Sequence, residues 1–145
     1  MADGGAGRDT LDLRKSAVRI EVRLDWASPG LCFGPGPCSS ANYWLLSIEN
    51  VIGTRYDDVV YGNDFKNYIK GSFGADLIHG MGGDDRIKGG AGADDLHGRQ
   101  GDDFLDGGPD SDTADGGADS NIGGVDQDSC YLVEFPSNCS IIFSP

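Results

Sequence analysis

Aspartate recurs at a fixed spacing in the middle of this sequence, and carboxylates in such a series suit one kind of chemistry. When the chain is laid out in blocks of nine from Gly53, the sixth position holds Asp or Asn in all eight blocks. These residues are Asp58, Asn67, Asp76, Asp85, Asp94, Asp103, Asp112 and Asn121. A short carboxylate in a tight turn can bind a hard cation at about 2.3–2.6 Å. The series therefore predicts rows of calcium ligands.

The composition points to the same partner. The chain has 21 Asp against three Glu, an imbalance that general acidity does not produce. The formal net charge of -13 argues against nucleic acid and anionic membranes, because a phosphate-binding face needs Lys and Arg. No apolar run approaches the roughly 20 residues that span a bilayer, so we expect no membrane insertion. Calcium ions are the expected partner.

Glycine and apolar residues occupy other fixed positions of the same blocks. The first position is Gly in all eight blocks, and the fourth is Gly74, Gly83, Gly92 and Gly101 in four of them. The eighth position is Val, Ile or Leu in the first six blocks. Glycine permits turns with positive φ that point carbonyl oxygens inward, and the three residues that follow can form a short strand. The four fourth-position glycines are therefore included among the predicted metal ligands.

One block carries a recognisable consensus. Residues 89–97, GGAGADDLH, match G-G-x-G-x-D-x-U-x at every constrained position. Over about half its length the chain resembles the RTX (repeats-in-toxin, haemolysin-type) family. The resemblance implies an all-β fold, a right-handed parallel β-roll (β-solenoid) with Ca²⁺ as cofactor. In that roll two blocks complete one coil, so each block stacks on the next but one.

This stacking rule predicts two ladders of loops. One contains Asp58, Asp76, Asp94 and Asp112, and the other contains Asn67, Asp85, Asp103 and Asn121. Neighbouring strands lie about 4.8 Å apart, so paired carboxylates repel by roughly 3 to 4 kcal/mol at an effective dielectric of 20. An inserted cation reverses the sign. We expect the strongest sites at the pairs 58/76, 76/94, 94/112 and 85/103, and weaker sites at 67/85 and 103/121.

A disordered, glycine-rich linker is the alternative interpretation of this composition. A linker has no reason to keep an apolar residue at the eighth position through six blocks. The linker interpretation can still describe the calcium-free chain, because six buried side chains offset little of the entropy lost in ordering some seventy residues. We therefore expect folding to be coupled to ion binding.

The flanks predict two caps around the repeats. Residues 1–52 contain a repeat-like stretch from Gly4 to Asp12 and an alternating strand at 17–26, and form an N-terminal β capping segment. Residues 53–124 form the β-roll, which we expect to fade at its end, and 125–145 form a C-terminal cap. Three aromatic residues of the first segment could bind sugar, but covering the roll is the commoner fate. These are Trp26, Tyr43 and Trp44.

The cysteines and histidines come in pairs. Cys32/Cys38 and Cys130/Cys139 predict local disulfides, although four cysteines allow three pairings and zinc is a competitor. His79 and His97 share the ninth position, 18 residues apart, and predict neighbours on one sheet face. A solvated cross-strand pair is the expected arrangement, with a transition-metal site as the alternative.

The sequence contains no catalytic motif that we recognise. With two His there is no H-E-x-x-H, and no G-x-S-x-G appears, so an enzyme is not expected. We expect a calcium-binding structural module of a secreted or cell-surface bacterial protein, folding on calcium outside the cell. The alternative is a self-assembling filament or surface-layer subunit, a homo-oligomer built from rolls stacked end to end.

Overall fold

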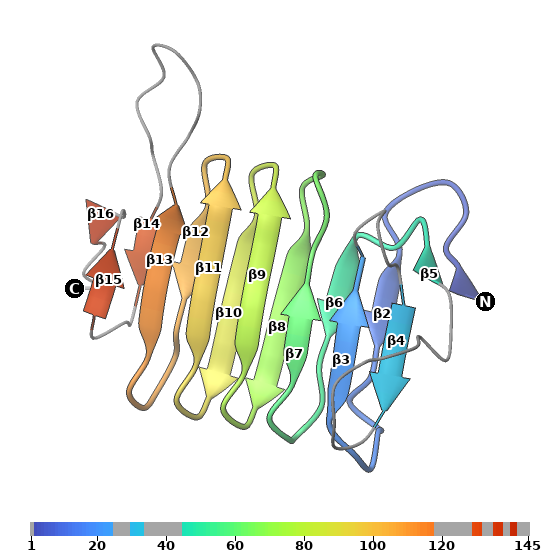
Figure 1. Ribbon diagram of the computed structural model, residues 1–145, viewed down its shortest axis with the longest axis horizontal. Helices are drawn as coiled ribbons and strands as arrows, with labels where there is room; N and C mark the ends of the chain where they lie inside the picture. Colours follow the sequence, from blue (N-terminus) through green and yellow to red (C-terminus); the bar gives the residue numbers. More distant parts are fainter. Residues whose placement is uncertain are drawn as a thin grey trace.

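The described part of the chain folds into a roll of short β-strands. The computed structural model describes residues 2–24, 30–33, 45–117, 129–131, 135–137 and 140–141. Within these residues every regular element is a strand, and the strands form two walls that face each other (Figure 1). The described part contains no helix long and apolar enough to cross a membrane. The expected all-β solenoid is confirmed.

Two seven-stranded sheets make the walls in the described part of the chain. The first contains, in spatial order, β16 (Ser140–Ile141), β14 (Ser129–Tyr131), β12 (Phe104–Asp106), β10 (Arg86–Ala91), β8 (Tyr68–Phe73), β6 (Asn50–Ile52) and β2 (Thr10–Asp12). The second contains β15 (Phe135–Ser137), β13 (Thr113–Gly117), β11 (Asp95–Gln100), β9 (Leu77–Gly82), β7 (Val59–Tyr61), β3 (Ile20–Arg23) and β4 (Gly30–Phe33). A separate pair joins β1 (Ala2–Asp3) to β5 (Leu45–Leu46).

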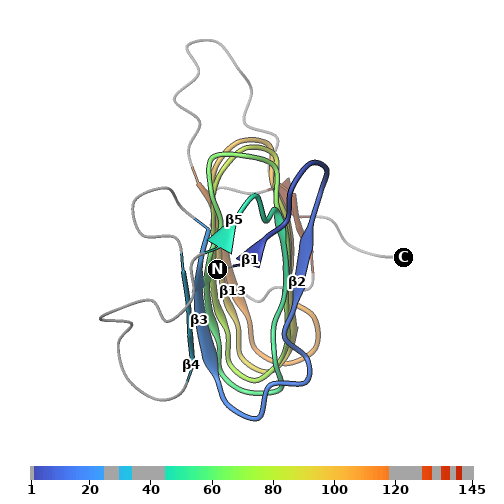
Figure 2. The ribbon, with the colours of Figure 1, turned by 90° about the vertical axis from the view of Figure 1, so that its right-hand side faces the viewer.

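The register confirms that each block stacks on the next but one. Ile87 lies opposite Ile69 in the first sheet, and Leu96 lies opposite Ile78 in the second. Both pairings are parallel. The chain therefore alternates between the two walls, and a view along the roll shows the coils superposed as a flattened ring (Figure 2). Aspartates of alternate blocks are brought to the same edge by this alternation.

The eighth-position side chains fill the space between the walls. Val60, Ile69, Ile78, Ile87, Leu96 and Leu105 are all fully buried. Burying one such side chain stabilises the fold by about 1.5–3 kcal/mol. Each strand of the repeats buries one aliphatic side chain, so the core between the walls is thin and the turns must hold the coils at the two edges.

The N-terminal strand is shorter than its alternating pattern predicts. The pattern over 17–26 places Val18 on the buried face, but β3 begins at Ile20 and Val18 is 41% exposed. The reason is local: the Ser16 hydroxyl donates to the Val18 carbonyl oxygen at 2.7 Å and accepts its N–H at 3.3 Å, which makes a turn there. Trp26, Tyr43 and Trp44 lie outside the described residues.

Candidate metal centre

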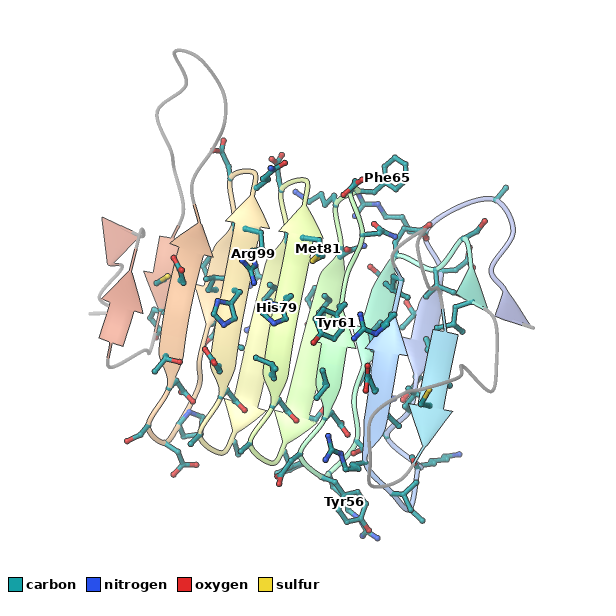
Figure 3. All side chains as sticks on the ribbon, viewed as in Figure 1. Tyr56, Tyr61, Phe65, His79, Met81 and Arg99 are labelled. Atoms are coloured by element: carbon teal, nitrogen blue, oxygen red, sulfur yellow. The ribbon has the colours of Figure 1, made fainter. Side chains whose placement is uncertain are left out.

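The ladder residues gather at the two edges of the roll, where the chain turns from one wall to the other. Figure 3 labels Tyr56 at one edge and Phe65 at the opposite edge, each in the turn that leads to the first residue of its ladder. All seven ladder residues of the described part are buried: Asp58, Asn67, Asp76, Asp85, Asp94, Asp103 and Asp112. Asn121 lies outside the described residues. Buried carboxylates are rare unless they are paired or coordinate a metal.

One oxygen of each ladder carboxylate serves the backbone. The Asp58 N–H donates to Asp76 Oδ1 at 2.8 Å, and the Asp76 N–H donates to Asp94 Oδ1 at 2.9 Å. The same bond joins Asp85 to Asp103 on the other edge at 2.8 Å. Each bond spans 18 residues, so it fixes the separation of two stacked loops and holds every carboxylate against the loop of the preceding coil.

The second oxygen of three ladder carboxylates indicates a cation site. The Oδ2 atoms of Asp76, Asp85 and Asp94 are buried and have no hydrogen-bond partner. Each lies against the first-position glycine of its own block, where an added Cβ would collide with it. A buried carboxylate oxygen with no donor costs several kcal/mol unless a proton or a metal neutralises it. These atoms have the properties of metal ligands.

The pKa values of the same carboxylates also indicate a cation site. Burial, reinforced by neighbouring carboxylates, raises the pKa of Asp76 to about 8. Burial likewise raises the pKa of Asp85 to about 8 and that of Asp94 to about 7. In the metal-free roll these groups therefore retain protons near neutral pH. A divalent cation could take the place of the protons, which is the exchange expected of a calcium site.

The turns supply backbone oxygens beside these carboxylates. The second and fourth positions adopt positive φ in successive loops, as at Ser72 (98°) and Gly74 (102°), and at Met81 (85°) and Gly83 (86°). The Gly74 carbonyl oxygen lies against Gly92 of the next coil, so closely that a Cβ there would overlap it. No group of three or more His, Cys, Asp or Glu side chains gathers in the described residues, so a site would combine two carboxylates with carbonyls. Such all-oxygen sets suit calcium.

Gly92 is a position where this geometry leaves no room for a side chain. We expect Gly92→Ala to lower the stability of the calcium-loaded roll by about 2–4 kcal/mol, since φ is 130° and the new Cβ meets the Gly74 carbonyl. The midpoint of thermal unfolding at saturating calcium measures this. Gly82→Ala is the matched control, because its Cβ would lie 3.4 Å from its nearest neighbour, Asp64 Cα. Equal midpoints for the two variants would contradict the prediction.

The turns of the first two blocks are closed differently. Asp58 Oδ2 accepts the Thr54 N–H at 2.6 Å, and its Oδ1 accepts both the Thr54 hydroxyl at 3.0 Å and the Ile20 N–H at 2.9 Å. Asn67 donates to Asn63 Oδ1 at 3.1 Å and accepts the Asn63 N–H at 2.9 Å. Hydrogen bonds therefore satisfy both side-chain oxygens of Asp58 and the amide of Asn67, whereas later ladder carboxylates have an oxygen without a donor.

Sequence reasoning did not identify Thr54 and Asn63 as partners of the ladder. A signal was present: both occupy the second position, where the consensus has glycine, and Tyr56 and Phe65 replace glycine at the fourth. None of these four residues adopts positive φ. Non-glycine residues at both positions thus mark a turn of another kind.

His79 and His97 are neighbours, but they are not a solvated pair. The rings stack at 4.5 Å, and Tyr61 stacks on the other side of His79 at 5.0 Å, on one outer wall of the roll (Figure 3). His79 is buried, and the Arg99 guanidinium lies 3.3 Å from its Nδ1. Burial first, then His97 and Arg99, lowers the pKa of His79 to about 4. The adjacent guanidinium makes this an unfavourable place for a transition metal.

Comparison with known families agrees with the geometry. A family model described as the RTX calcium-binding nonapeptide repeat matches residues 47–64, 61–96 and 88–122, which together span just over half of the 145-residue chain. No curated protein matches the chain. The matched residues include every described ladder position, and the cofactor of these repeats is Ca²⁺. The chain therefore belongs to the RTX family of calcium-binding nonapeptide-repeat proteins.

Proposed function

We propose that this roll is a folding module of a secreted or cell-surface bacterial protein, ordered by calcium outside the cell. The repeat family binds calcium and builds a structural solenoid. The observation that carries the proposal is the set of buried carboxylate oxygens at Asp76, Asp85 and Asp94 that have no donor. Affinities of about 10⁻⁴ to 10⁻³ M, typical of extracellular calcium modules, would keep the chain unfolded until it meets millimolar calcium.

We assign the ions to the pairs 76/94, 94/112 and 85/103, with carbonyl oxygens from the turns that contain Gly74, Gly83, Gly92 and Gly101. In these pairs the loops have positive φ at the fourth position, and Oδ1 is already fixed by the neighbouring coil. Asp58 and Asn67 contribute less, because hydrogen bonds from Thr54 and Asn63 compete for their oxygens. The pair 103/121 stays a prediction from the sequence alone.

The proposed role is structural rather than catalytic. The fold is a calcium-binding solenoid. The two histidines, the commonest acid–base groups, are used in the stack on β9 and β11. If the chain is part of a larger enzyme, we expect the chemistry to belong to another part of that enzyme.

Disulfide bonds at the two ends of the roll would fit a protein that works outside the cell. Among the described residues no cysteine is a free thiol. Cys32 lies in β4 at the first end of one sheet, whereas Cys130 lies in β14 near the last end of the other, so these two cannot pair. Cys38 and Cys139 lie outside the described residues. We propose the local pairs Cys32/Cys38 and Cys130/Cys139, which an oxidising compartment would preserve.

Growth into a filament receives less support. β4 runs antiparallel to β3 and covers the first edge of one sheet, whereas all other pairings of that sheet in the described residues are parallel. A second copy could not simply continue the parallel ladder at that edge. We therefore favour the single module over the end-to-end assembly.

Far-UV circular dichroism tests the proposed function. On titrating calcium into the chelator-treated chain we expect a transition from coil to β-structure, because the ions remove repulsion between stacked carboxylates. Magnesium should fail, since it demands a stricter octahedral geometry and loses water reluctantly. A spectrum that does not change on chelation, or an equal response to both ions, would contradict calcium-coupled folding.

A further inference from the structure

The residues before the matched repeats form one more loop of the same kind. In the block from Gly4 to Asp12, Gly5 and Gly7 at the second and fourth positions have φ of 86° and 127°. The strand that follows, β2, pairs in parallel with β6, and Leu11 lies opposite Val51. The block thus adds a turn to the edge that carries Asn67, Asp85 and Asp103, although it lies outside residues 47–122.

Its partner loop is forty residues away in sequence. The Asp9 N–H donates to Glu49 Oε2 at 2.9 Å, and the Asp9 carbonyl oxygen accepts the Asn50 N–H at 3.0 Å. These contacts repeat those of the ladder, where Asp76 N–H donates to Asp94 and the Asp76 carbonyl accepts the Asp95 N–H. Glu49 therefore stands in the ladder position of its coil, with a longer side chain.

An oxygen without a donor is again present. Asp9 Oδ2 is buried and has no hydrogen-bond partner, like the corresponding atoms of Asp76, Asp85 and Asp94. The Ser47 carbonyl oxygen, from a residue with φ of 53°, lies against Gly4, as does the Asp9 side chain, and a Cβ on Gly4 would collide with both. In the described residues neither Asp9 nor Glu49 forms an ion pair with Lys or Arg.

We infer that Asp9 and Glu49, with the Ser47 carbonyl, hold a calcium ion at the N-terminal end of the roll, separate from the sites of the matched repeats. Asn67 lies between this site and the sites of the matched repeats, because its amide donates to the Glu49 carbonyl at 3.0 Å and to Asn63. The inference rests on the proposed function, since it assumes that the roll binds calcium. The ion would join two loops that are forty residues apart in sequence.

The number of calcium ions bound per chain tests this site. Equilibrium dialysis against radioactive calcium at saturation compares the wild-type chain with Asp9→Asn, Glu49→Gln and the double variant. Each substitution removes a charge, and Gln keeps an oxygen to accept the Asp9 N–H. We expect every variant to bind one ion fewer than wild type, and the double variant to lose one rather than two, because both residues serve the same ion.

Asp12→Asn is the matched control. Asp12 lies at the end of β2, the strand that follows Asp9, is exposed and pairs with Arg14, so the ion count of this variant should equal that of wild type. Unchanged counts in both single variants would overturn the N-terminal site alone. A loss of more than one ion from Glu49→Gln would also overturn it, because a purely structural role would then explain the effect. A wild-type chain that binds no calcium would instead reject the proposed function.

Discussion

Asp94→Asn will weaken calcium-driven folding more than any other single substitution in the ladders. Asp94 faces two neighbouring loops, because its Oδ1 accepts the Asp76 N–H and its own N–H donates to Asp112 at 2.9 Å. Its carboxylate would serve the ions of both pairs. Unit charges 4 Å apart interact by about 4 kcal/mol at an effective dielectric of 20, and a third of that is a tenfold change in affinity. We expect the calcium midpoint to rise at least tenfold.

The calcium titration by circular dichroism measures this shift, and an exposed carboxylate provides the control. Asp84→Asn removes the same charge from a turn position that is open to solvent. The amide at position 94 still accepts the Asp76 N–H, so the comparison isolates the charge from the hydrogen bond. If the two variants shift the midpoint equally, the effect comes from net charge and the assignment of Asp94 as a shared ligand is wrong.

Acidification should stabilise the metal-free roll but weaken calcium binding. The pKa values of Asp76 and Asp85 are raised to about 8 and that of Asp94 to about 7, well above those of an unfolded chain. Protons therefore bind the metal-free roll more tightly than the coil. The contribution of these groups to stability is fully present below about pH 4 and is lost as pH rises through 7 and 8. With calcium, protons compete for the ligands, so acidification should release the ion.

Circular dichroism at pH 5 to 9, in chelator and over a calcium titration at each pH, measures both effects. In chelator the β signal should grow as pH falls from 9 to 5, and in calcium the midpoint concentration should rise over the same interval. Added salt distinguishes buried groups from the general charge of -13, because it screens exposed charges far more than buried ones. A metal-free signal that is flat over this range would contradict the role of the buried carboxylates.

Most of the fold was predictable because the period of nine encodes it directly. An apolar residue at the eighth position of each nine-residue block can face one core only if each block forms half a coil, and the 18-residue register of Ile69 and Ile87 follows. The burial of the ladder aspartates also follows, since the same coil brings them to one edge. Periodic residues reveal periodic structure without any knowledge of the individual contacts.

The departures from the period were harder to predict. Asp58 looks like Asp76 in sequence, yet the Thr54 hydroxyl and the distant Ile20 N–H satisfy its oxygens. Glu49 lies nine residues before Asp58, but it joins the ladder only because a strand from the far N-terminus pairs with β6. Contacts between segments about forty residues apart do not follow the period of nine, so the sequence pattern alone could not assign them.

The hydrogen-bonded turns at 53–58 and 62–67 imply an order in which the coils form. Because side chains of the protein close these turns, the turns need no ion of their own, and β6, β7 and β8 would be the first strands to order when calcium is added. Each captured ion would then attach the next coil to an edge that already exists. The segment after Arg99, which has no Lys or Arg, would be the last to order and the first to be released.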